Sequence, residues 1–437
     1  MKRMITVLLV LCLLLAGCGG QAKEETLPPE SPPVRWECGG IGTKNGNDRT
    51  VAQGISLRTV GYLELKYYAG AIPDTDYAIS WFAYDAEQAF LGGSVTALGN
   101  GVGISAKQIL EKYPEAVYIR LLLRSAYTDG KVEFTETLPI RVYTAREGWP
   151  GLPMEQEVIA DLSAIQGVYL QDGEAFGDVL FTFKADGTGN AYNVNTGEFL
   201  DAFYLGGKDK IAPHVNSASF SDQYYKEGDK YPLLYTSMYN NVTALNKYLL
   251  GTCCVYRITE LGGQFDAQLV QVIRLSFIAD RDLWLSPKEN SRPFGNFVVD
   301  TDRDMLYAFV PRDDYNTTRF FGFALPEANA GTYEEEFGCK QVVLRPEDIM
   351  RQFDVGYFSS PQGCTYADGM IYSVEGFNSF DDVPPFLRVV DVEKGLQVKT
   401  VNLGQLGLDR EPEVITVTNG QLYYINADMV LRKLWFP

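Results

Sequence analysis

The sequence predicts an all-β chain in which an N-terminal β-sandwich is followed by a β-propeller. A proline-anchored hairpin at residues 361–374, with an Asp-Gly turn, returns at residues 412–425 with an Asn-Gly turn. A looser copy begins at Pro293. The chain also has 27 Tyr and 24 Phe, residues that strands favour. A repeated antiparallel unit of this kind is typical of propeller blades.

The first 17 residues are expected to be an export signal. Lys2 and Arg3 precede an apolar run, residues 5–15, that is too short to span a membrane. The run ends in Leu-Ala-Gly-Cys18, which resembles the bacterial lipobox. The resemblance implies a lipoprotein whose Cys18 carries acyl chains such as palmitate and anchors the mature chain to the lipid bilayer. The alternative is a plain secretory signal with an incidental cysteine.

Residues 18–33 are polar and rich in proline, so we expect an extended tether that builds no core. The 38 basic and 56 acidic residues of the chain give a net charge of −18. This balance argues against a nucleic-acid partner and against binding flat on anionic lipid, since both attract basic patches.

Residues 34–145 are expected to form the β-sandwich, with seven to nine strands in all. A short helix is expected at residues 105–113, with Ser105 as its N-cap. Three clear strands are expected at residues 62–68, 77–84 and 117–123.

The aromatic pattern at residues 77–85, followed by Tyr-Ile-Arg at residues 118–120, resembles the small sandwich modules appended to bacterial surface and polysaccharide-acting proteins. Aromatic rings on a rigid β scaffold can stack on the apolar face of a sugar. The candidates for such stacking are Trp81, Tyr84, Tyr357 and Phe377, and the alternative is that they are core residues.

A junction rich in glycine and proline, residues 146–153, precedes the expected propeller at residues 153–437. The propeller divides into five repeats, at residues 165–206, 211–277, 293–350, 361–403 and 412–437. Glycine marks expected turns at residues 172–173 and 186–187. The last repeat is a strand short, and residues 157–162 are placed to complete it. Five blades are expected, or six if the long second repeat is split.

This region resembles the TolB-like propellers of bacterial lipoproteins, a resemblance that implies fold alone. In such propellers the innermost strand of each blade begins at the mouth of the central channel. The residues that the repeat register places there, which we call the polar mouth, are His214, Asn216, Phe294, Asn296, Gln362 and Glu413. They could bind a polar ligand, or their side chains could satisfy the backbone where each strand starts.

The sequence lacks the residues that several kinds of catalytic and metal-binding site require. His214 is the only histidine, which excludes multi-histidine metal sites, and no Gly-x-Ser-x-Gly elbow supports a catalytic triad. Residues 300–304 space three aspartates like a calcium loop but lack the glycine and glutamate of an EF-hand. The five cysteines expected in the mature chain besides Cys18 match no zinc pattern, and adjacent Cys253 and Cys254 are expected to be unpaired. No cofactor or metal is therefore expected.

The expectation is a membrane-anchored lipoprotein of the cell envelope that acts as a non-catalytic binding module. Its expected partner is a glycan or another envelope polymer, or an envelope protein. One alternative is a glycoside hydrolase that uses two of the carboxylates of Asp300, Glu375 and Glu413. The other is a structural adaptor that docks proteins on a broad apolar patch.

Overall fold

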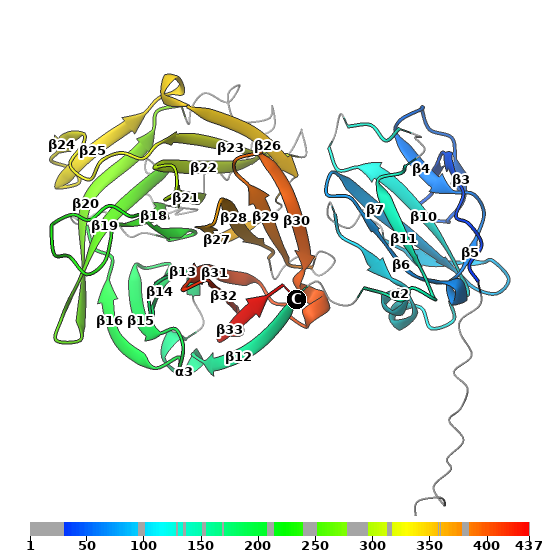
Figure 1. The fold of residues 1–437 in the computed structure, drawn as a ribbon, viewed down its shortest axis with the longest axis horizontal. Coiled ribbons are helices and arrows are strands. Elements are labelled where there is room, and N and C mark those ends of the chain that lie inside the picture. Colours follow the sequence, from blue (N-terminus) through cyan, green and yellow to red (C-terminus); the bar gives the residue numbers. More distant parts are fainter. Residues whose placement is uncertain are drawn as a thin grey trace, which may run out of the picture.

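The computed structural model describes most of the chain, and the statements below concern those residues. They are residues 30–94, 101–127, 130–133, 137–150, 154–167, 170–207, 214–238, 251–277, 296–312, 317–356, 358, 360–377 and 384–436. Many small, mainly antiparallel sheets make up the fold, and helices are few and short, so the all-β prediction is confirmed (Figure 1). No helix in this part of the chain has the length and apolar character to cross a membrane.

The N-terminal part contains two facing sheets. The first runs in the order β1 (Trp36–Cys38), β4 (Ser56–Thr59), β10 (Tyr118–Ser125), β7 (Tyr77–Tyr84) and β8 (Phe90–Gly93), with β5 (Leu63–Glu64) also paired to β10. The second contains β11 (Ile140–Thr144), β6 (Tyr68–Pro73) and β9 (Ile104–Ser105), and β2 (Gly40–Ile41) pairs with β3 (Asp48–Arg49). Alternate residues of β7 and β10, such as Ile79, Trp81 and Leu121, share one core with Tyr68 and Ala71 of β6.

Two local elements of this part were predicted from the sequence, a helix that is confirmed and a strand that is not. Helix α2 (Ala106–Lys112) is capped by Ser105, whose side chain accepts a hydrogen bond from the backbone N–H of Gln108, so that prediction is confirmed. The strand predicted at residues 62–68 is wrong. Strand β5 is followed by the 3₁₀ turn η1 (Leu65–Tyr67) before β6 begins. The turn lets the chain pass from the first sheet to the second while Leu65 stays in their shared core.

The second part consists of five sheets. Each of the first four is built on four strands, which are consecutive except in the third sheet, and the last takes three strands from the end of the chain. They are β13 (Leu170–Phe176), β14 (Val179–Lys184), β15 (Thr188–Asn193) and β16 (Phe199–Tyr204); β17 (Ala218–Phe220), β18 (Leu234–Met238), β19 (Thr252–Leu261) and β20 (Gln264–Leu275); β21 (Asn296–Asp300), β22 (Met305–Arg312), β23 (Thr317–Ala324) and β26 (Arg351–Gly356); β27 (Pro361–Ala367), β28 (Met370–Glu375), β29 (Phe386–Asp391) and β30 (Leu396–Asn402); and β31 (Pro412–Thr418), β32 (Gln421–Asn426) and β33 (Val430–Trp435). Short helical elements are α3 (Ser163–Gln166), η4 (Pro346–Asp348) and η5 (Leu403–Leu406).

The last sheet takes its fourth strand from the beginning of the second part. Strand β12 (Glu155–Asp161) pairs antiparallel with β33, as the sequence predicted for residues 157–162. The predicted hairpin turns at Asp368-Gly369 and Asn419-Gly420 are also confirmed, and all four residues have positive φ angles of 50° to 79°.

The long second repeat forms one sheet rather than two. An excursion of the third repeat, β24 (Thr332–Glu334) and β25 (Cys339–Leu344), extends this sheet, because β25 pairs in parallel with β20. The turn predicted at Asp172-Gly173 is wrong, since both residues lie inside β13. A Cβ on Gly173 would come within 2.6 Å of the carbonyl oxygen of Phe181, so this glycine allows close packing and makes no turn.

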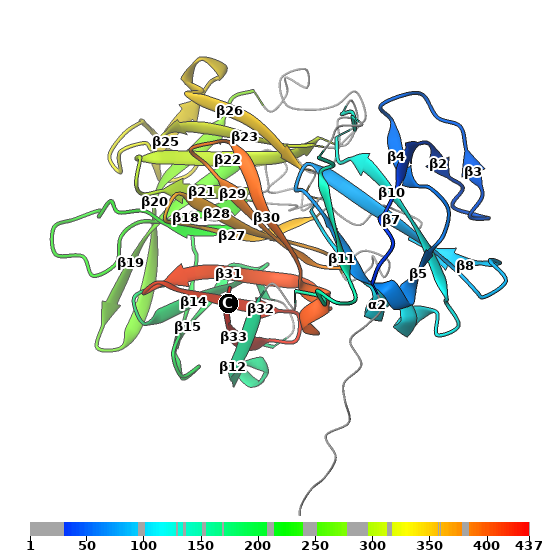
Figure 2. The same ribbon diagram turned by 45° about the vertical axis from the view of Figure 1, so that its right-hand side comes forward.

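The five sheets are arranged around a common centre, with β13, β17, β21, β27 and β31 innermost (Figures 1 and 2). The outermost strands are β16, β26, β30 and β12, and in the second sheet β25 and β24 lie outside β20. Each sheet shares a hydrophobic core with the next one along the chain. The last sheet shares a core with the first, in which Val414 and Ile425 pack with Leu180 and Tyr192. The N-terminal part lies beside the sheet that ends in β30, and the side chains of Gln405 and Gln108 join the two parts by a hydrogen bond of 3.3 Å.

Candidate functional site

Three of the five innermost strands are irregular near their first residues. The pairing register shifts between Leu170 and Asp172 in β13, between Pro361 and Cys364 in β27, and at Glu413 in β31, between Pro412 and Val414. A β-bulge inserts an extra residue into a strand and re-aims the side chains beside it. Regular strand pairing is therefore interrupted near the first residues of β13, β27 and β31, which lie at the centre of the five sheets.

Two predicted amides of the polar mouth contact each other there. The Asn216 side chain donates to Oδ1 of Asn296 at 3.2 Å and to the carbonyl oxygen of Pro361 at 3.1 Å. The Asn296 side chain in turn donates to the carbonyl oxygen of Gln362 at 2.5 Å. Both asparagines are buried. Their amides brace the backbone at the start of β27, which is the structural alternative that the sequence left open for them.

Gln362 lies on the bulge of β27, and Glu413 lies on the bulge of β31. Nε2 of Gln362 donates to Oε1 of Glu411 at 2.7 Å and to the carbonyl oxygen of Gly376 at 3.3 Å. Glu413 is buried, with 7% of its surface exposed. Burial raises the pKa of Glu413 well above its usual range, and the nearby carboxylates of Glu411 and Asp172 raise it further.

Asp172 and Glu174 of β13 complete a group that we call the carboxyl cluster, which consists of Asp172, Glu174 and Glu413. Thr365 donates to Oε1 of Glu174 at 3.0 Å. Within the described residues, neither oxygen of Asp172 nor Oε2 of Glu174 accepts a hydrogen bond of good geometry, although the backbone N–H groups of Gly173 and Ala218 lie near Asp172. The sequence does not indicate either acid as a site residue, because the Asp172-Gly173 pair predicts a turn where β13 runs on.

The protonation of these two acids follows from their burial. Asp172 is 0% exposed, and burial raises its pKa well above the usual range, although the backbone amides of Gly173 and Ala218 act in the opposite direction. Burial also raises the pKa of Glu174 well above its usual range, against the hydroxyls of Thr365 and Thr416. In the described part of the chain no Lys or Arg pairs with these acids, so the cluster is a site of uncompensated acidic groups.

His214 is half-buried and precedes β17. Burial lowers its pKa, so the imidazole is neutral at pH 7. Phe294, the remaining member of the predicted polar mouth, lies outside the described residues, as does Cys18.

The other two acids proposed for hydrolysis lie in ion pairs. Asp300 is 0% exposed, pairs with Arg303 at 3.2 Å, and accepts hydrogen bonds from the backbone amides of Asp302 and Arg303. Glu375 accepts from Nε of Arg388 at 2.8 Å, and both side chains are buried. Two carboxyl groups held in this way do not face each other across a substrate.

The described residues also show the state of the turn after Asp300, of the potential metal ligands and of the cysteines. The turn after Asp300 is tied to the next sheet, because the Tyr366 hydroxyl donates to Oδ2 of Asp302 at 2.7 Å. No three His, Cys, Asp or Glu side chains of the described part are arranged to hold a metal ion. All five described cysteines are free, including the adjacent Cys253 and Cys254, which the sequence predicted to be unpaired and which are fully buried.

The aromatic candidates for sugar stacking are divided. Trp81 and Tyr84 are buried core residues, and the Tyr84 hydroxyl donates to the carbonyl oxygen of Gly46. Phe377 is exposed, and Tyr357 lies outside the described residues. The sequence analysis did not select Tyr62, whose exposed ring meets that of Tyr84 edge-on with centroids 4.8 Å apart.

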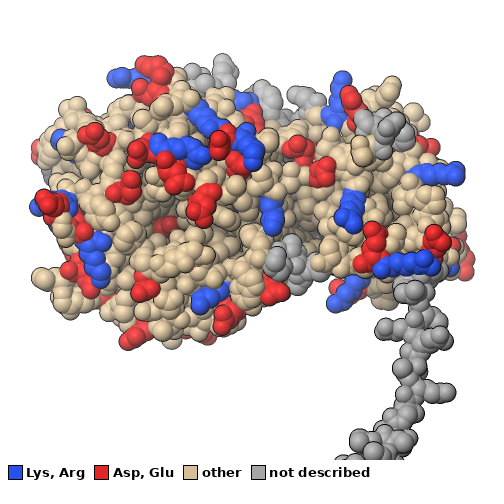
Figure 3. Space-filling view, in the orientation of Figure 1, with Lys and Arg blue, Asp and Glu red and all other residues tan. Residues whose placement is uncertain are grey.

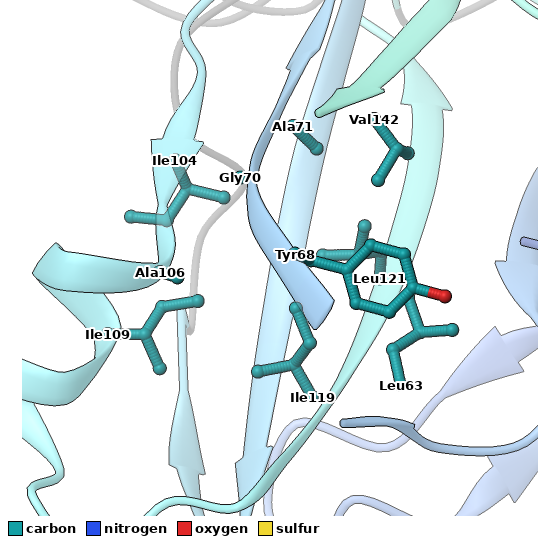
Figure 4. Close-up of a pocket in the computed structure, with 10 residues that line it drawn as sticks. All are labelled: Leu63, Tyr68, Gly70, Ala71, Ile104, Ala106, Ile109, Ile119, Leu121 and Val142. Atoms are coloured by element: carbon teal, nitrogen blue, oxygen red, sulfur yellow. The ribbon is translucent and has the colours of Figure 1, made fainter. Parts of the chain in front are cut away.

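A small cavity lies far from this centre, in the core of the N-terminal part (Figure 4). Its lining is apolar and comes from both facing sheets and helix α2, with Tyr68, Ile109 and Leu121 among the residues. A cavity with this lining is a packing feature of the core and offers no polar group to orient a ligand.

Charges on the surface are mixed. Figure 3 shows Asp and Glu side chains interspersed with Lys and Arg over the visible face. Arg257 forms an ion pair with Asp229, and Lys230 forms one with Glu260.

Comparison with known proteins gives no family. No family model matches the chain, and no curated protein matches it. Among solved structures, a glutaminyl cyclase of Myxococcus xanthus is 11% identical with a TM-score of 0.38, covering 64% of this chain and 95% of its own. A protein of unknown function from Bacteroides thetaiotaomicron is 12% identical with a TM-score of 0.34, covering 92% of this chain and 98% of its own. The computationally designed Ika8 protein is 10% identical with a TM-score of 0.29, covering 64% and 100%. At such low TM-scores nothing about function is taken from these similarities.

Proposed function

We propose that this protein is a membrane-anchored lipoprotein of the bacterial cell envelope that binds a glycan or another envelope polymer without catalysis. Cys18 is its lipidation site. The two N-terminal sheets are a β-sandwich, and the five sheets that follow are the blades of a closed five-bladed propeller. The cyclic order of the shared cores and the pairing of β12 with β33 support this architecture.

The observation that carries the binding role is the carboxyl cluster, which shares Glu413 with the polar mouth. Buried polar atoms normally have hydrogen-bond partners, yet neither oxygen of Asp172 nor Oε2 of Glu174 accepts a hydrogen bond of good geometry from the described residues. A ligand rich in hydroxyl groups can donate hydrogen bonds to such oxygens. Gln362 and His214 are both only half-buried, and Gln362 bonds to Glu411, two residues before Glu413. The asparagines of the mouth are assigned the supporting role, since their amides brace β27.

Hydrolysis is the weaker candidate on geometric grounds. Asp300 and Glu375 are held in ion pairs, and Asp172, the acid that joins Glu413, is fully buried. A carboxylate that attacks a sugar or activates water on it must reach the sugar ring. The adaptor alternative rests on a broad exposed apolar patch, and no contact described above favours it.

The test uses the mature chain from residue 18 with Cys18→Ser, so that the protein is complete but soluble without lipid. It is incubated with a panel of envelope polysaccharides, and both its retention and the release of reducing ends are measured. Retention without release is expected. Release of reducing ends would replace the proposal by hydrolysis, and retention by no polysaccharide would overturn glycan binding.

Substitutions then locate the binding. Gln362→Ala and His214→Ala are expected to reduce retention because both side chains lie at the mouth. Tyr333→Ala removes an exposed ring on β24, at the outer edge of the second sheet, and serves as the control. Retention that is lost with Tyr333→Ala and kept with the two mouth variants would move the site away from the channel.

A further inference from the structure

Phe377 is the one exposed phenylalanine in the described part of the chain, and it lies beside the polar mouth. Strand β28 ends at Glu375, which pairs with Pro361 at the start of β27, and Phe377 follows two residues later with 41% of its surface exposed. Nε2 of Gln362 donates to the carbonyl oxygen of Gly376 at 3.3 Å. Standard backbone dimensions then place the Cα of Phe377 within about 6 Å of that nitrogen. An exposed aromatic residue therefore adjoins a polar residue of the mouth.

The backbone that presents Phe377 is held in place. Gly376 has a φ angle of 151°, and a Cβ at that position would lie 3.0 Å from the side chains of two prolines, so any other residue would be strained here. Glu375, the residue before it, accepts a hydrogen bond of 2.8 Å from Nε of Arg388, and both of these side chains are buried. Because the strand end is fixed before a ligand arrives, less conformational entropy is lost when the ring makes a contact.

Gln362 supplies a hydrogen-bond acceptor next to this ring. The N–H groups of its side chain donate to the carbonyl oxygen of Gly376 and to Oε1 of Glu411, the latter at 2.7 Å. Its own Oε1 accepts no hydrogen bond from the described residues, and the side chain is only half-buried. An acceptor beside an apolar ring suits a ligand that has an apolar face and hydroxyl groups around its rim, as a neutral sugar ring has.

Resting on the proposed function, we propose that Phe377 and Gln362 form a subsite for a neutral pyranose ring whose hydroxyls and linkages are equatorial, as in a β-linked glucan. Equatorial substituents leave only C–H groups on the two faces of such a ring. One face can therefore lie flat on the phenyl ring of Phe377 while a rim hydroxyl donates to Oε1 of Gln362. An axial linkage, as in an α-linked glucan, places an oxygen on one face of each ring, and covering that face removes the oxygen from water without giving it a partner.

The test measures the affinity of cellohexaose and maltohexaose for the mature chain with Cys18→Ser. Both probes are glucose oligomers of equal length, and they differ only in the configuration of the linkage. We expect cellohexaose to bind about tenfold more tightly or better, a difference that one aromatic contact residue commonly supplies. In Phe377→Ala this preference should fall to about twofold or less, because the flat surface is gone. Tyr333→Ala, which removes an exposed ring from β24, should leave the preference unchanged.

Two further variants separate stacking from a structural role of Phe377. Phe377→Trp keeps a flat ring, so it should keep the preference, and its fluorescence should change when cellohexaose is added more than that of the unsubstituted protein does. Phe377→Leu keeps an apolar side chain without a flat face, so it should lose the preference. A preference that persists in Phe377→Leu would show that any apolar side chain suffices here and would overturn the stacking arrangement.

The possible outcomes separate the two proposals. Equal affinity for both hexamers leaves glycan binding intact and overturns the equatorial subsite. Binding of neither hexamer, when another polysaccharide of the panel is retained, overturns the equatorial subsite as well, whereas retention of no polysaccharide overturns both proposals. A preference for cellohexaose that survives in Phe377→Ala would overturn the placement of the subsite at this ring.

Discussion

Gly363 and Asp172 touch across two different sheets at the centre of the molecule. A Cβ at position 363 would lie 2.5 Å from Oδ1 of Asp172 and 2.4 Å from the carbonyl oxygen of Glu413, closer than real Cβ atoms approach. The φ angle of Gly363 is not positive, so the glycine is required by space and not by backbone conformation. The absence of a side chain in β27 is thus what allows a buried carboxyl group of β13 to reach between the strands.

Gly363→Ala is expected to destabilise the protein by about 1–3 kcal/mol, the usual cost of overpacking a rigid site. The neighbour on one side is backbone, which cannot rotate away. Denaturant unfolding measures the change, and Gly206→Ala is the matched control. A Cβ at Gly206 would meet only the Tyr204 ring at 3.4 Å and 3.7 Å, an ordinary contact. Equal stability of the two variants would contradict the close approach.

Asp172→Asn is expected to change how stability depends on pH. The pKa of Asp172 lies well above its ordinary value of 3.8 in the folded protein because the group is buried. Below pH 3.8 both the folded and the unfolded protein hold the proton. As pH rises above 3.8, the unfolded chain releases the proton while the folded protein keeps it. The contribution of this group to stability therefore decreases with pH until the raised pKa is reached. Asparagine does not titrate, so the variant escapes this loss.

The quantity to measure is the difference in unfolding free energy between Asp172→Asn and the unsubstituted protein at several pH values. Using the difference removes the groups that act in the opposite direction, such as Asp229, whose pKa is lowered by its hydrogen bonds with Arg257. The difference should shift in favour of the variant as pH rises above 3.8. A difference that does not vary with pH would show that Asp172 is ionised when folded.

Glu375→Gln is expected to cost about 3–5 kcal/mol, because it leaves the buried guanidinium of Arg388 without its counter-charge. Removing both charges, in Glu375→Leu with Arg388→Met, should cost less than the single change, since no buried charge remains. A double-mutant cycle by denaturant unfolding, completed by the single variants Glu375→Leu and Arg388→Met, measures the coupling between the two side chains. Two single substitutions whose effects simply add would show that the pair is not coupled.

The parts of the fold that could be predicted from sequence are those fixed by local chemistry. Asn419 and Asp368 adopt positive φ angles of 50° before a glycine, which is why the two hairpins could be located from a dipeptide and its flanking strands. The helix after Ser105 was equally predictable, since its cap is made within four residues. The pairing of residues 157–162 with the last sheet followed from the missing fourth strand of that repeat.

What could not be predicted depends on contacts between distant segments. Strand β25 pairs in parallel with β20, although three strands of another sheet lie between them in the sequence. No local pattern indicates that partner. Asp172-Gly173 has the composition of a turn, but the atoms that would exclude a Cβ at Gly173, such as the carbonyl oxygen of Phe181, belong to another strand. Asp172 was missed for this reason. The ion pair of Glu375 with Arg388, which removes a proposed catalytic acid, likewise forms only when β28 pairs with β29.

Thr416→Val tests the junction between the first and last sheets. Oγ1 of Thr416 in β31 accepts a hydrogen bond of 3.0 Å from the backbone N–H of Ala175 in β13, and both residues are buried. Valine has nearly the same shape, so the change leaves the N–H of Ala175 without an acceptor and should cost about 1–3 kcal/mol. Thr332→Val, on an exposed strand of the β24–β25 excursion, should change stability by no more than about 0.5 kcal/mol. Hydrogen exchange provides the second measurement, because the amide of Ala175 should lose protection in Thr416→Val while amides within β22 and β23 keep theirs. If Ala175 stays protected, strand β13 is held at this point by its own sheet, and the contact with the last sheet contributes little to closing the arrangement.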